Sequence, residues 1–229
     1  MKISLKFPTP LRLKKALRFV MRGFGWAVIG FVALVLILRF VNPPLTPYVT
    51  AERLRLGELR QEWVAIEEIN PHLRRAAIAA EDANFCLHWG FDVDALRSAL
   101  EDGAQRGGST ITQQTVKNVF LWQGRSWVRK GLEAAMTPVV DLLWSKHRIL
   151  EVYLNVAEFD EGVFGAQSAS RWYFGVDASG VTLAQASALA SVLPNPKNRS
   201  ARAPGNRARR IASGAQTLAA DGRAACIED

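Results

Sequence analysis

The chain has 229 residues, of which 49% are hydrophobic and 22% charged, so it can bury a core of ordinary size and is not a fully disordered protein. Its formal charge is +8, but seven of these charges precede residue 23 and Arg39 supplies the eighth, which leaves residues 40–229 neutral overall. A nucleic-acid-binding domain carries its own excess of Lys and Arg, so no nucleic-acid partner is expected.

Residues 19–41 predict a membrane-spanning helix. The stretch is apolar apart from Arg22 and Arg39 near its two ends. At about 1.5 Å per residue it would span about 34 Å, which exceeds the bilayer core of about 30 Å. A buried core helix and a cleaved signal peptide are the alternatives. The basic N-terminal flank disfavours the first, and the lack of a small-residue cleavage site after the span disfavours the second.

The basic residues before the span predict its orientation. Residues 1–18 form a basic tail, and no charge of either sign lies between residues 41 and 51. Because positive flanks stay in the cytoplasm, we expect a single-pass protein with its N-terminus inside and its body outside. Residues 42–49 predict a Pro-rich, stiff and extended spacer, and residues 50–229 predict one domain.

This domain is predicted to be mostly α-helical, because helical periodicity and helix-start signals recur along it and no convincing alternating strand pattern does. Two capping boxes, at Thr110-Ile-Thr-Gln113 and Thr182-Leu-Ala-Gln185, mark helix starts, and Pro194 stops the second helix. The predicted helices cover residues 71–85, 93–104, 110–121, 126–143, 146–156, 182–193 and 206–220. The fourth of these has apolar residues at helical intervals, namely Val128, Leu132, Ala135, Met136, Val139 and Leu143.

A first candidate site is the acidic pair Glu81 and Asp82, which follows an apolar helix face and precedes His88 and Gly90. A carboxylate at the end of an apolar helix can be partly desolvated, which raises its pKa towards the range useful to a general base. A helix end with solvated acids is the alternative that spacing alone leaves open.

A second candidate site is residues 107–114, where two glycines lead into the capped helix start at Thr110. Free N–H groups, the positive helix end and three hydroxyls would together bind an anion, although an ordinary capped turn has the same local pattern. Lys117 and Arg125 follow this segment. Glu133 lies three and four residues after Lys130 and Arg129, so one acid can orient both cations; a solvated surface ion pair is the alternative.

These segments together resemble the motifs of the peptidoglycan glycosyltransferases, family 51. EDxxFxxHxG, GGSTITQQ, RKxxE and KxxILExYLN occur in the family's order, at residues 81–90, 107–114, 129–133 and 146–155. The resemblance covers residues 59–204. The chain looks like the monofunctional, membrane-anchored type, because it holds no SxxK or KTG motif of a penicillin-binding transpeptidase domain.

The resemblance implies a lysozyme-like α-helical fold with a cleft that faces the membrane. The implied reaction, in cell wall biogenesis, polymerises lipid II into β-1,4-linked glycan strands and releases undecaprenyl diphosphate. By similarity Glu81 is the base that deprotonates the 4-hydroxyl of the acceptor sugar, and the α linkage inverts to β. Glu133 corresponds to a second essential acid, for which we favour an orienting or phosphate–metal role over proton donation. The implied location is the bacterial inner membrane, with a periplasmic catalytic domain.

The departing diphosphate needs cations more than a strong general acid, because it leaves as a stabilised anion. The residues assigned to substrate binding on this basis are Ser109, Thr110, Gln113, Gln114, Lys117, Arg125, Arg129 and Lys130. No cofactor is required, although a divalent cation could bridge the diphosphate. The three histidines have no metal-ligand spacing, so no metal site is expected. Expected partners are lipid II, the growing glycan strand, the inner membrane and cell-wall synthesis or division proteins.

Two other functions stay open. A membrane-anchored lysozyme-like enzyme that cleaves peptidoglycan would share the fold and a catalytic Glu but would need no diphosphate site. An anchored protein could also bind lipid II without polymerising it. Cys86 and Cys226 would face an oxidising compartment, but their pairing does not follow from the sequence. The last predicted helix carries basic residues that we expect on a solvated or headgroup-facing surface, namely Arg207, Arg209 and Arg210.

Overall fold

The computed structural model describes residues 10–101, 108–124 and 126–228, in two compact units, Met1–Val41 and Asn42–Asp229. The first unit contains helix α1 (Pro10–Leu38), and residues Leu17–Leu38 are long and apolar enough to cross a membrane. Because Phe24, Trp26 and most of this stretch are exposed, α1 is not the buried core helix that the sequence left as an alternative. Its length and composition are consistent with the predicted membrane anchor.

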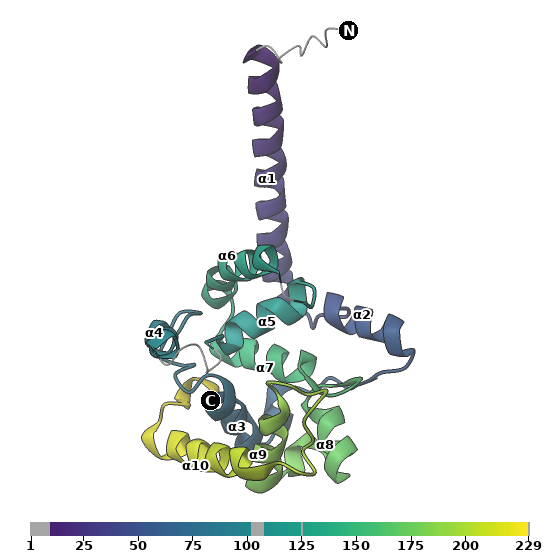
Figure 1. Cartoon of the computed structure of the whole chain (residues 1–229), viewed down its shortest axis with the longest axis vertical. Coiled ribbons are helices and arrows are strands. Elements are labelled where there is room, and N and C mark those ends of the chain that lie inside the picture. The colour runs from purple at the N-terminus through teal and green to yellow at the C-terminus, as the bar shows by residue number, and fades with distance from the viewer. Residues whose placement is uncertain (1–9, 102–107, 125, 229) are drawn as a thin grey trace. The chain divides into compact units, whose positions relative to one another are not determined.

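The second unit, which we call the body, is mostly helical, as predicted (Figure 1). Its helices are α2 (Pro47–Leu56), α3 (Pro71–Glu81), α4 (Val93–Glu101), α5 (Ile111–Phe120), α6 (Trp127–Leu143), α7 (Lys146–Val156), α8 (Ala166–Phe174), α9 (Leu183–Val192) and α10 (Gly205–Asp221). Three short 3₁₀ helices, η1 (Ile66–Glu68), η2 (Ala178–Gly180) and η3 (Ala225–Ile227), complete the helical part.

The predicted helix starts are confirmed where a capping box marks them. Thr110 and Thr182 each accept a hydrogen bond from the backbone N–H three residues later, at 3.2 and 3.3 Å. Helices α2 and α8 were not predicted. Helix α2 begins at Pro47, inside the segment predicted to be an extended spacer, because Thr46 caps its first turn. The end of the helix predicted over residues 93–104 lies partly outside the described residues.

A small three-stranded sheet was also missed. Strands β1 (Arg60–Gln61), β2 (Glu158–Asp160) and β3 (Val163–Phe164) lie in the order β1–β3–β2. Strand β3 pairs in parallel with β1 and antiparallel with β2. Strands of two or three residues are too short to show an alternating pattern in the sequence, and this explains the omission.

Helix α7 lies at the centre of the body. It is buried along most of its length and packs against α5, α8, η1 and η3 (Figure 1). Helices α3, α9 and α10 pack on one another and form a second group. Because α3 carries Glu81 and α5 carries Gln114 and Lys117, this packing decides what surrounds the candidate site.

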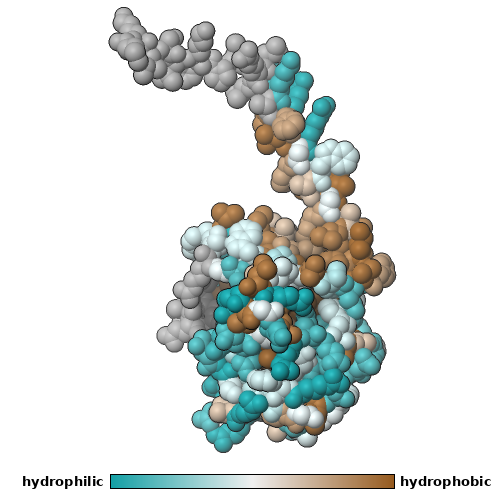
Figure 2. Space-filling view, turned by 90° about the vertical axis from the view of Figure 1, so that its right-hand side faces the viewer, coloured by the Kyte–Doolittle hydropathy of each residue, from teal (hydrophilic) through white to brown (hydrophobic). Residues whose placement is uncertain are grey.

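The apolar stripe predicted on α6 is not buried in the body: Val128, Leu132 and Ala135 are exposed, and Met136, Val139 and Leu143 are half-buried. The residues of α6 that are buried are Glu133, Thr137, Val140 and Asp141, whereas Val128, Leu132 and Leu142 are exposed. Trp127, at the start of the helix, is 93% exposed. Figure 2 shows that apolar side chains gather towards one end of the body, while the opposite end is mainly hydrophilic. An exposed apolar face of this kind is typical of a surface that meets a membrane or another protein.

A disulfide joins Cys86, in the loop after α3, to Cys226 in η3. This pairing, which the sequence left open, ties the loop that follows Glu81 to the C-terminal segment. The same segment is held by Arg74, whose Nη1 donates a hydrogen bond to the carbonyl oxygen of the buried Ile227 at 2.8 Å. The disulfide therefore closes a long loop around most of the body.

Replacing both cysteines with serine is expected to lower the free energy of unfolding by about 2–5 kcal/mol. The bond links positions 140 residues apart, and opening it restores conformational entropy to the unfolded chain. Urea unfolding with and without a thiol reductant measures the effect. The reductant should destabilise the wild type by the same amount and leave the double variant unchanged, and an unaffected wild type would contradict the prediction.

Candidate active site

Glu81 is the last residue of α3, and its side chain is only 9% exposed. Its Oε2 accepts a hydrogen bond of 2.8 Å from Nε2 of Gln114, and its Oε1 lies 3.4 Å from Nη2 of Arg207 on α10. Burial raises the pKa of Glu81, while the Gln114 hydrogen bond and the charges of Arg207 and Lys117 oppose this rise. A carboxylate with a raised pKa is suited to accept a proton near neutral pH.

Helix α3 ends at Glu81, four residues before the predicted end at residue 85. The cause is Asp82, whose carboxylate turns towards the start of α5. Its Oδ2 accepts a hydrogen bond of 3.0 Å from the backbone N–H of Ile111, and its Oδ1 lies 2.8 Å from Nε2 of His88. The contact with Ile111 joins residues 29 positions apart, so local sequence did not reveal the helix end.

At the start of α5, where the sequence predicted an anion site, the Asp82 carboxylate of the protein itself accepts the hydrogen bond from the N–H of Ile111. Thr110 and Gln113 are buried and bond to each other: the Thr110 N–H donates to Gln113 Oε1 at 2.9 Å. The Thr110 hydroxyl donates to the Gly90 carbonyl oxygen at 2.6 Å. Thr110 and Gln113 therefore cap the helix, and their predicted role in substrate binding finds no support in this geometry.

Thr110→Ala is expected to lower the free energy of unfolding by about 1–2 kcal/mol, because it removes a helix cap and a buried hydrogen bond. Ser109→Ala, one residue earlier, removes only the half-buried hydrogen bond that its hydroxyl accepts from Lys130 and should cost less, about 0.5 kcal/mol. Thermal unfolding of the two variants checks this difference. A Thr110→Ala variant of wild-type stability that binds substrate more weakly would restore the role predicted from the sequence.

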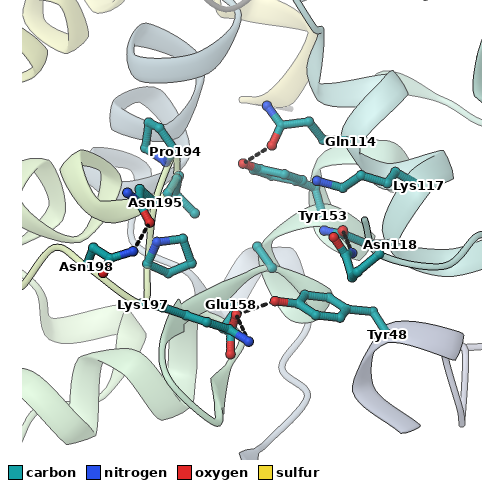
Figure 3. A pocket seen from close by; sticks show the side chains of 14 residues that line it. Tyr48, Gln114, Lys117, Asn118, Tyr153, Glu158, Pro194, Asn195, Lys197 and Asn198 are labelled. Atoms are coloured by element: carbon teal, nitrogen blue, oxygen red, sulfur yellow. Dashed lines mark hydrogen bonds and ion pairs between the residues drawn. The ribbon is translucent and has the colours of Figure 1, made fainter. Parts of the chain in front are cut away.

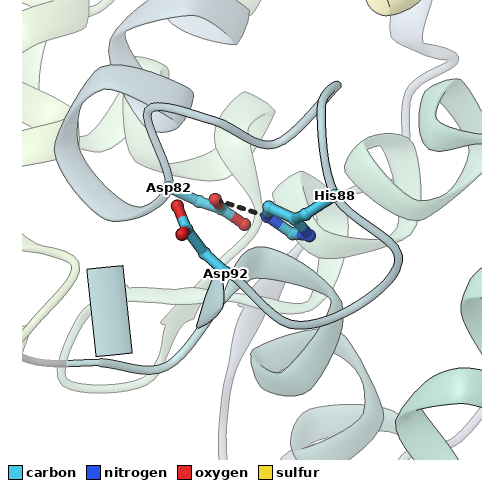
Figure 4. Close-up of side chains that lie close together, drawn as sticks. All are labelled: Asp82, His88 and Asp92. Carbon is cyan, nitrogen blue, oxygen red and sulfur yellow. Dashed lines mark hydrogen bonds and ion pairs between the residues drawn. The ribbon is translucent and has the colours of Figure 1, made fainter. Parts of the chain in front are cut away.

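Asp82, His88 and Asp92 approach one another in the loop between α3 and α4 (Figure 4), with one oxygen or nitrogen of each within 4.8 Å of the others. Asp92 accepts hydrogen bonds of 2.8 Å from Nδ2 of Asn84 and from the backbone N–H of Ala95. The carboxylate oxygens of both aspartates are thus engaged by donors of the protein. These contacts stabilise the conformation of the loop, and we assign no metal to the cluster.

Gln114 is held in one orientation by its two partners. The hydroxyl of the buried Tyr153, on α7, donates to Gln114 Oε1 at 3.3 Å, while Gln114 Nε2 donates to Glu81. Burial raises the pKa of Tyr153 well above its ordinary value, so the hydroxyl stays protonated and remains a donor. This role of Tyr153 was not predicted from the sequence, although the residue lies in the KxxILExYLN motif.

Two pockets adjoin the pair formed by Glu81 and Gln114. One, of about 270 Å³, is lined by Gln114, Lys117 and Tyr153 and faces residues 194–198 across the opening (Figure 3). The other, of about 210 Å³, is lined by Glu81 with Asp82, Asn84, Ser109 and Thr110. The buried carboxylate and its amide partner therefore have space for ligands in two places.

Glu133 lies on α6 and is 2% exposed. Its Oε2 lies 2.7 Å from Nη1 of Arg129, its Oε1 pairs with Nζ of Lys130, and Lys130 also donates to Ser109 Oγ at 3.1 Å. The predicted orientation of two cations by one acid is confirmed, and burial of the acid excludes a solvated surface pair. Removing either partner of such a pair would leave a buried charge without compensation, which costs free energy. The two cations are therefore held beside Glu133.

Lys117 lies between the two acidic centres. Burial lowers the pKa of its ammonium group, the carboxylates of Glu133 and Glu81 oppose this effect, and the neighbouring cations Arg129 and Lys130 add to it. It forms no ion pair with any residue in the described part of the chain. A half-buried ammonium group with no ion-pair partner in the described part of the chain is available to an anionic ligand.

The structure thus brings together Glu81, Gln114 and Lys117, and beside them Ser109, Arg129, Lys130 and Glu133. Arg125 lies outside the described residues. Arg209 and Arg210 are exposed, as predicted, but the prediction was wrong for Arg207, which reaches Glu81. Its position could have been found from helical phase, because Arg207 precedes the buried Ile211 by four residues and shares its face.

Comparison with known proteins gives consistent results. Residues 49–219 match the model of a family described as Transglycosylase. A biosynthetic peptidoglycan transglycosylase of Jannaschia sp. (strain CCS1) is 56% identical over 217 residues, which cover 92% of this chain and 90% of the relative. Proteins of the same name from Pseudomonas entomophila (strain L48) and Pseudomonas putida (strain W619) are 49% and 48% identical over 202 residues, or 84% of this chain and 86% of each relative.

Proposed function

The chain belongs to the transglycosylase family and is a peptidoglycan glycosyltransferase of cell wall synthesis, and we propose that it polymerises lipid II into β-1,4-linked glycan strands with release of undecaprenyl diphosphate. The observation that carries the proposal is the buried Glu81, bonded to Gln114, with pockets on both members of the pair and a group of cations beside it. The presence of two pockets supports a reaction that brings together an acceptor and a donor.

In the proposed reaction Glu81 accepts the proton of the acceptor's 4-hydroxyl group. The oxygen attacks the anomeric carbon of the donor from the face opposite the diphosphate. The bond between this carbon and the diphosphate oxygen breaks, and its electron pair stays on the departing oxygen. The α linkage becomes β. Gln114 holds the Glu81 carboxylate in place, and Tyr153 in turn holds Gln114.

The departing diphosphate meets the positive charge of Lys117, Arg129 and Lys130. A charge that develops on the leaving group is stabilised by cations already fixed in position. Glu133 fixes two of them, and its two ion pairs favour an orienting role over proton donation. A divalent cation that bridges the diphosphate would add to this stabilisation.

We place the protein in the bacterial inner membrane, anchored by α1, with a cytoplasmic N-terminus and a periplasmic body. The apolar length of Leu17–Leu38 supports the anchor, and the basic residues before it support the orientation. The disulfide suits an oxidising compartment outside the cytoplasm. The exposed apolar face of α6 suits contact with the lipid that carries the substrate.

The test is incubation of the purified full chain in detergent with lipid II and, separately, with finished glycan strands. Growth of new strands from lipid II supports the proposal. Shortening of finished strands would instead identify a peptidoglycan-cleaving enzyme, and binding of lipid II without its consumption would identify a binding protein.

Deletion of residues 1–41 is expected to leave a folded, soluble body, because Asn42–Asp229 forms a compact unit of its own. Activity on lipid II embedded in vesicles should fall, since the anchor raises the local concentration of enzyme at the membrane. Circular dichroism and strand synthesis in vesicles and in detergent provide the measurements. A truncated protein that does not fold would show that the anchor belongs to the domain.

A further inference from the structure

The guanidinium group of Arg207 lies against the last turn of α3. Its Nη2 is 3.4 Å from Glu81 Oε1 and donates to the Ala80 carbonyl oxygen at 3.3 Å. Its Nε is buried and has no hydrogen-bond partner among the described residues. The side chain is 34% exposed, whereas Arg209 and Arg210 on the same helix are exposed. Arg207 is therefore turned inward, towards the candidate base.

Other groups that face Glu81 interact with it differently. Lys117 on α5 and the exposed Arg199, before α10, act on its charge without forming an ion pair with it. Gln114 is neutral, and Tyr153 on α7 stays protonated. The Asp82 carboxylate is engaged elsewhere, by Nε2 of His88 and by the backbone N–H of Ile111 on α5.

Within the described part of the chain, Arg207 is thus the one cation in ion-pair contact with Glu81. This contact matters because burial alone favours the protonated carboxyl group, which cannot act as a base.

We propose that Arg207 is a positioning residue for the transfer reaction: it keeps Glu81 ionised and holds one carboxylate oxygen while Gln114 holds the other. The inference rests on the proposed function, because it assigns Arg207 a task only if Glu81 is the base. The separation of 3.4 Å and the partial exposure of the cation suit this task. A shorter, fully buried pair would stabilise the anion more strongly and make it a weaker base.

The experiment compares Arg207→Met, Arg207→Gln and Arg207→Lys with the wild type, and uses Arg209→Met as the control of equal charge on the same helix. Strand synthesis from lipid II in detergent is measured across the pH range, with kcat and KM determined separately. Below the pKa of Glu81, kcat falls as the pH drops; we call this part of the pH profile the acid limb. Loss of the cation raises the pKa of Glu81, so in Arg207→Met and Arg207→Gln the acid limb should move upward by about one pH unit. Below this limb the rate should fall about tenfold relative to the wild type.

Arg207→Lys should give a smaller upward shift, because its charge sits on a shorter side chain, and Arg209→Met should give none. Thermal unfolding identifies which variants are folded at the assay temperature. An acid limb that does not move in any folded Arg207 variant would overturn the inference. So would a rise in KM without a shift of the limb, which would make Arg207 a substrate-binding residue, or an equal shift in Arg209→Met.

Failure of the proposed function would give a different result. A wild type that makes no strands from lipid II would refute the function itself. An active wild type whose acid limb is independent of Arg207 would refute only the role of this arginine.

Discussion

Glu81→Gln is expected to reduce kcat for strand synthesis by about 10²–10⁴-fold while leaving the fold and the binding of lipid II intact. The amide has nearly the shape of the carboxylate, and its oxygen can still accept the hydrogen bond from Gln114. It cannot accept the proton of the acceptor hydroxyl. Strand synthesis in detergent and binding of lipid II to the same preparation measure the two properties.

The pH dependence adds a second criterion. In the wild type, activity should fall as the pH drops through the raised pKa of Glu81, because the base becomes protonated. The residual activity of Glu81→Gln should lack this acid limb. Glu58→Gln, which neutralises an exposed acid on the same body, is the matched control and should behave as the wild type. Near-normal turnover of Glu81→Gln would reject the assigned base.

Lys117→Ala is expected to reduce strand synthesis by about 10²–10³-fold, because a cation already fixed beside the leaving group stabilises the departing diphosphate by several kcal/mol. Since Lys117 has no ion-pair partner among the described residues, its removal should cost little stability. Its lowered pKa also predicts that wild-type activity falls at alkaline pH, earlier than for an ordinary lysine, as the ammonium group loses its proton.

Arg53→Ala is the matched control for this substitution. Arg53 lies exposed on α2, and its replacement also removes one positive charge. Measurement in detergent removes any anionic membrane surface that could respond to net charge. Equal loss in the two variants would show that total charge matters and would remove Lys117 from the site, whereas loss confined to Lys117→Ala would support a diphosphate near α5.

Local patterns in the sequence were sufficient for the family and for most of the helices. The capping boxes at Thr110 and Thr182 define helix starts because each involves only four consecutive residues. The four motifs identified the family, which the comparisons confirm. The spacing of Arg129, Lys130 and Glu133 predicted their ion pairs, because residues three and four apart share one face of a helix.

The tertiary structure alone decided the environments of these groups. Asp82 accepts a hydrogen bond from the start of α5, 29 residues away, and Arg207 reaches Glu81 from 126 residues away. The burial that raises the pKa of Glu81, the partial exposure of the α6 stripe and the bond between Cys86 and Cys226 are likewise products of packing. The physical reason is that a side chain's hydration and partners depend on which elements pack against it, and periodicity within one element does not encode this.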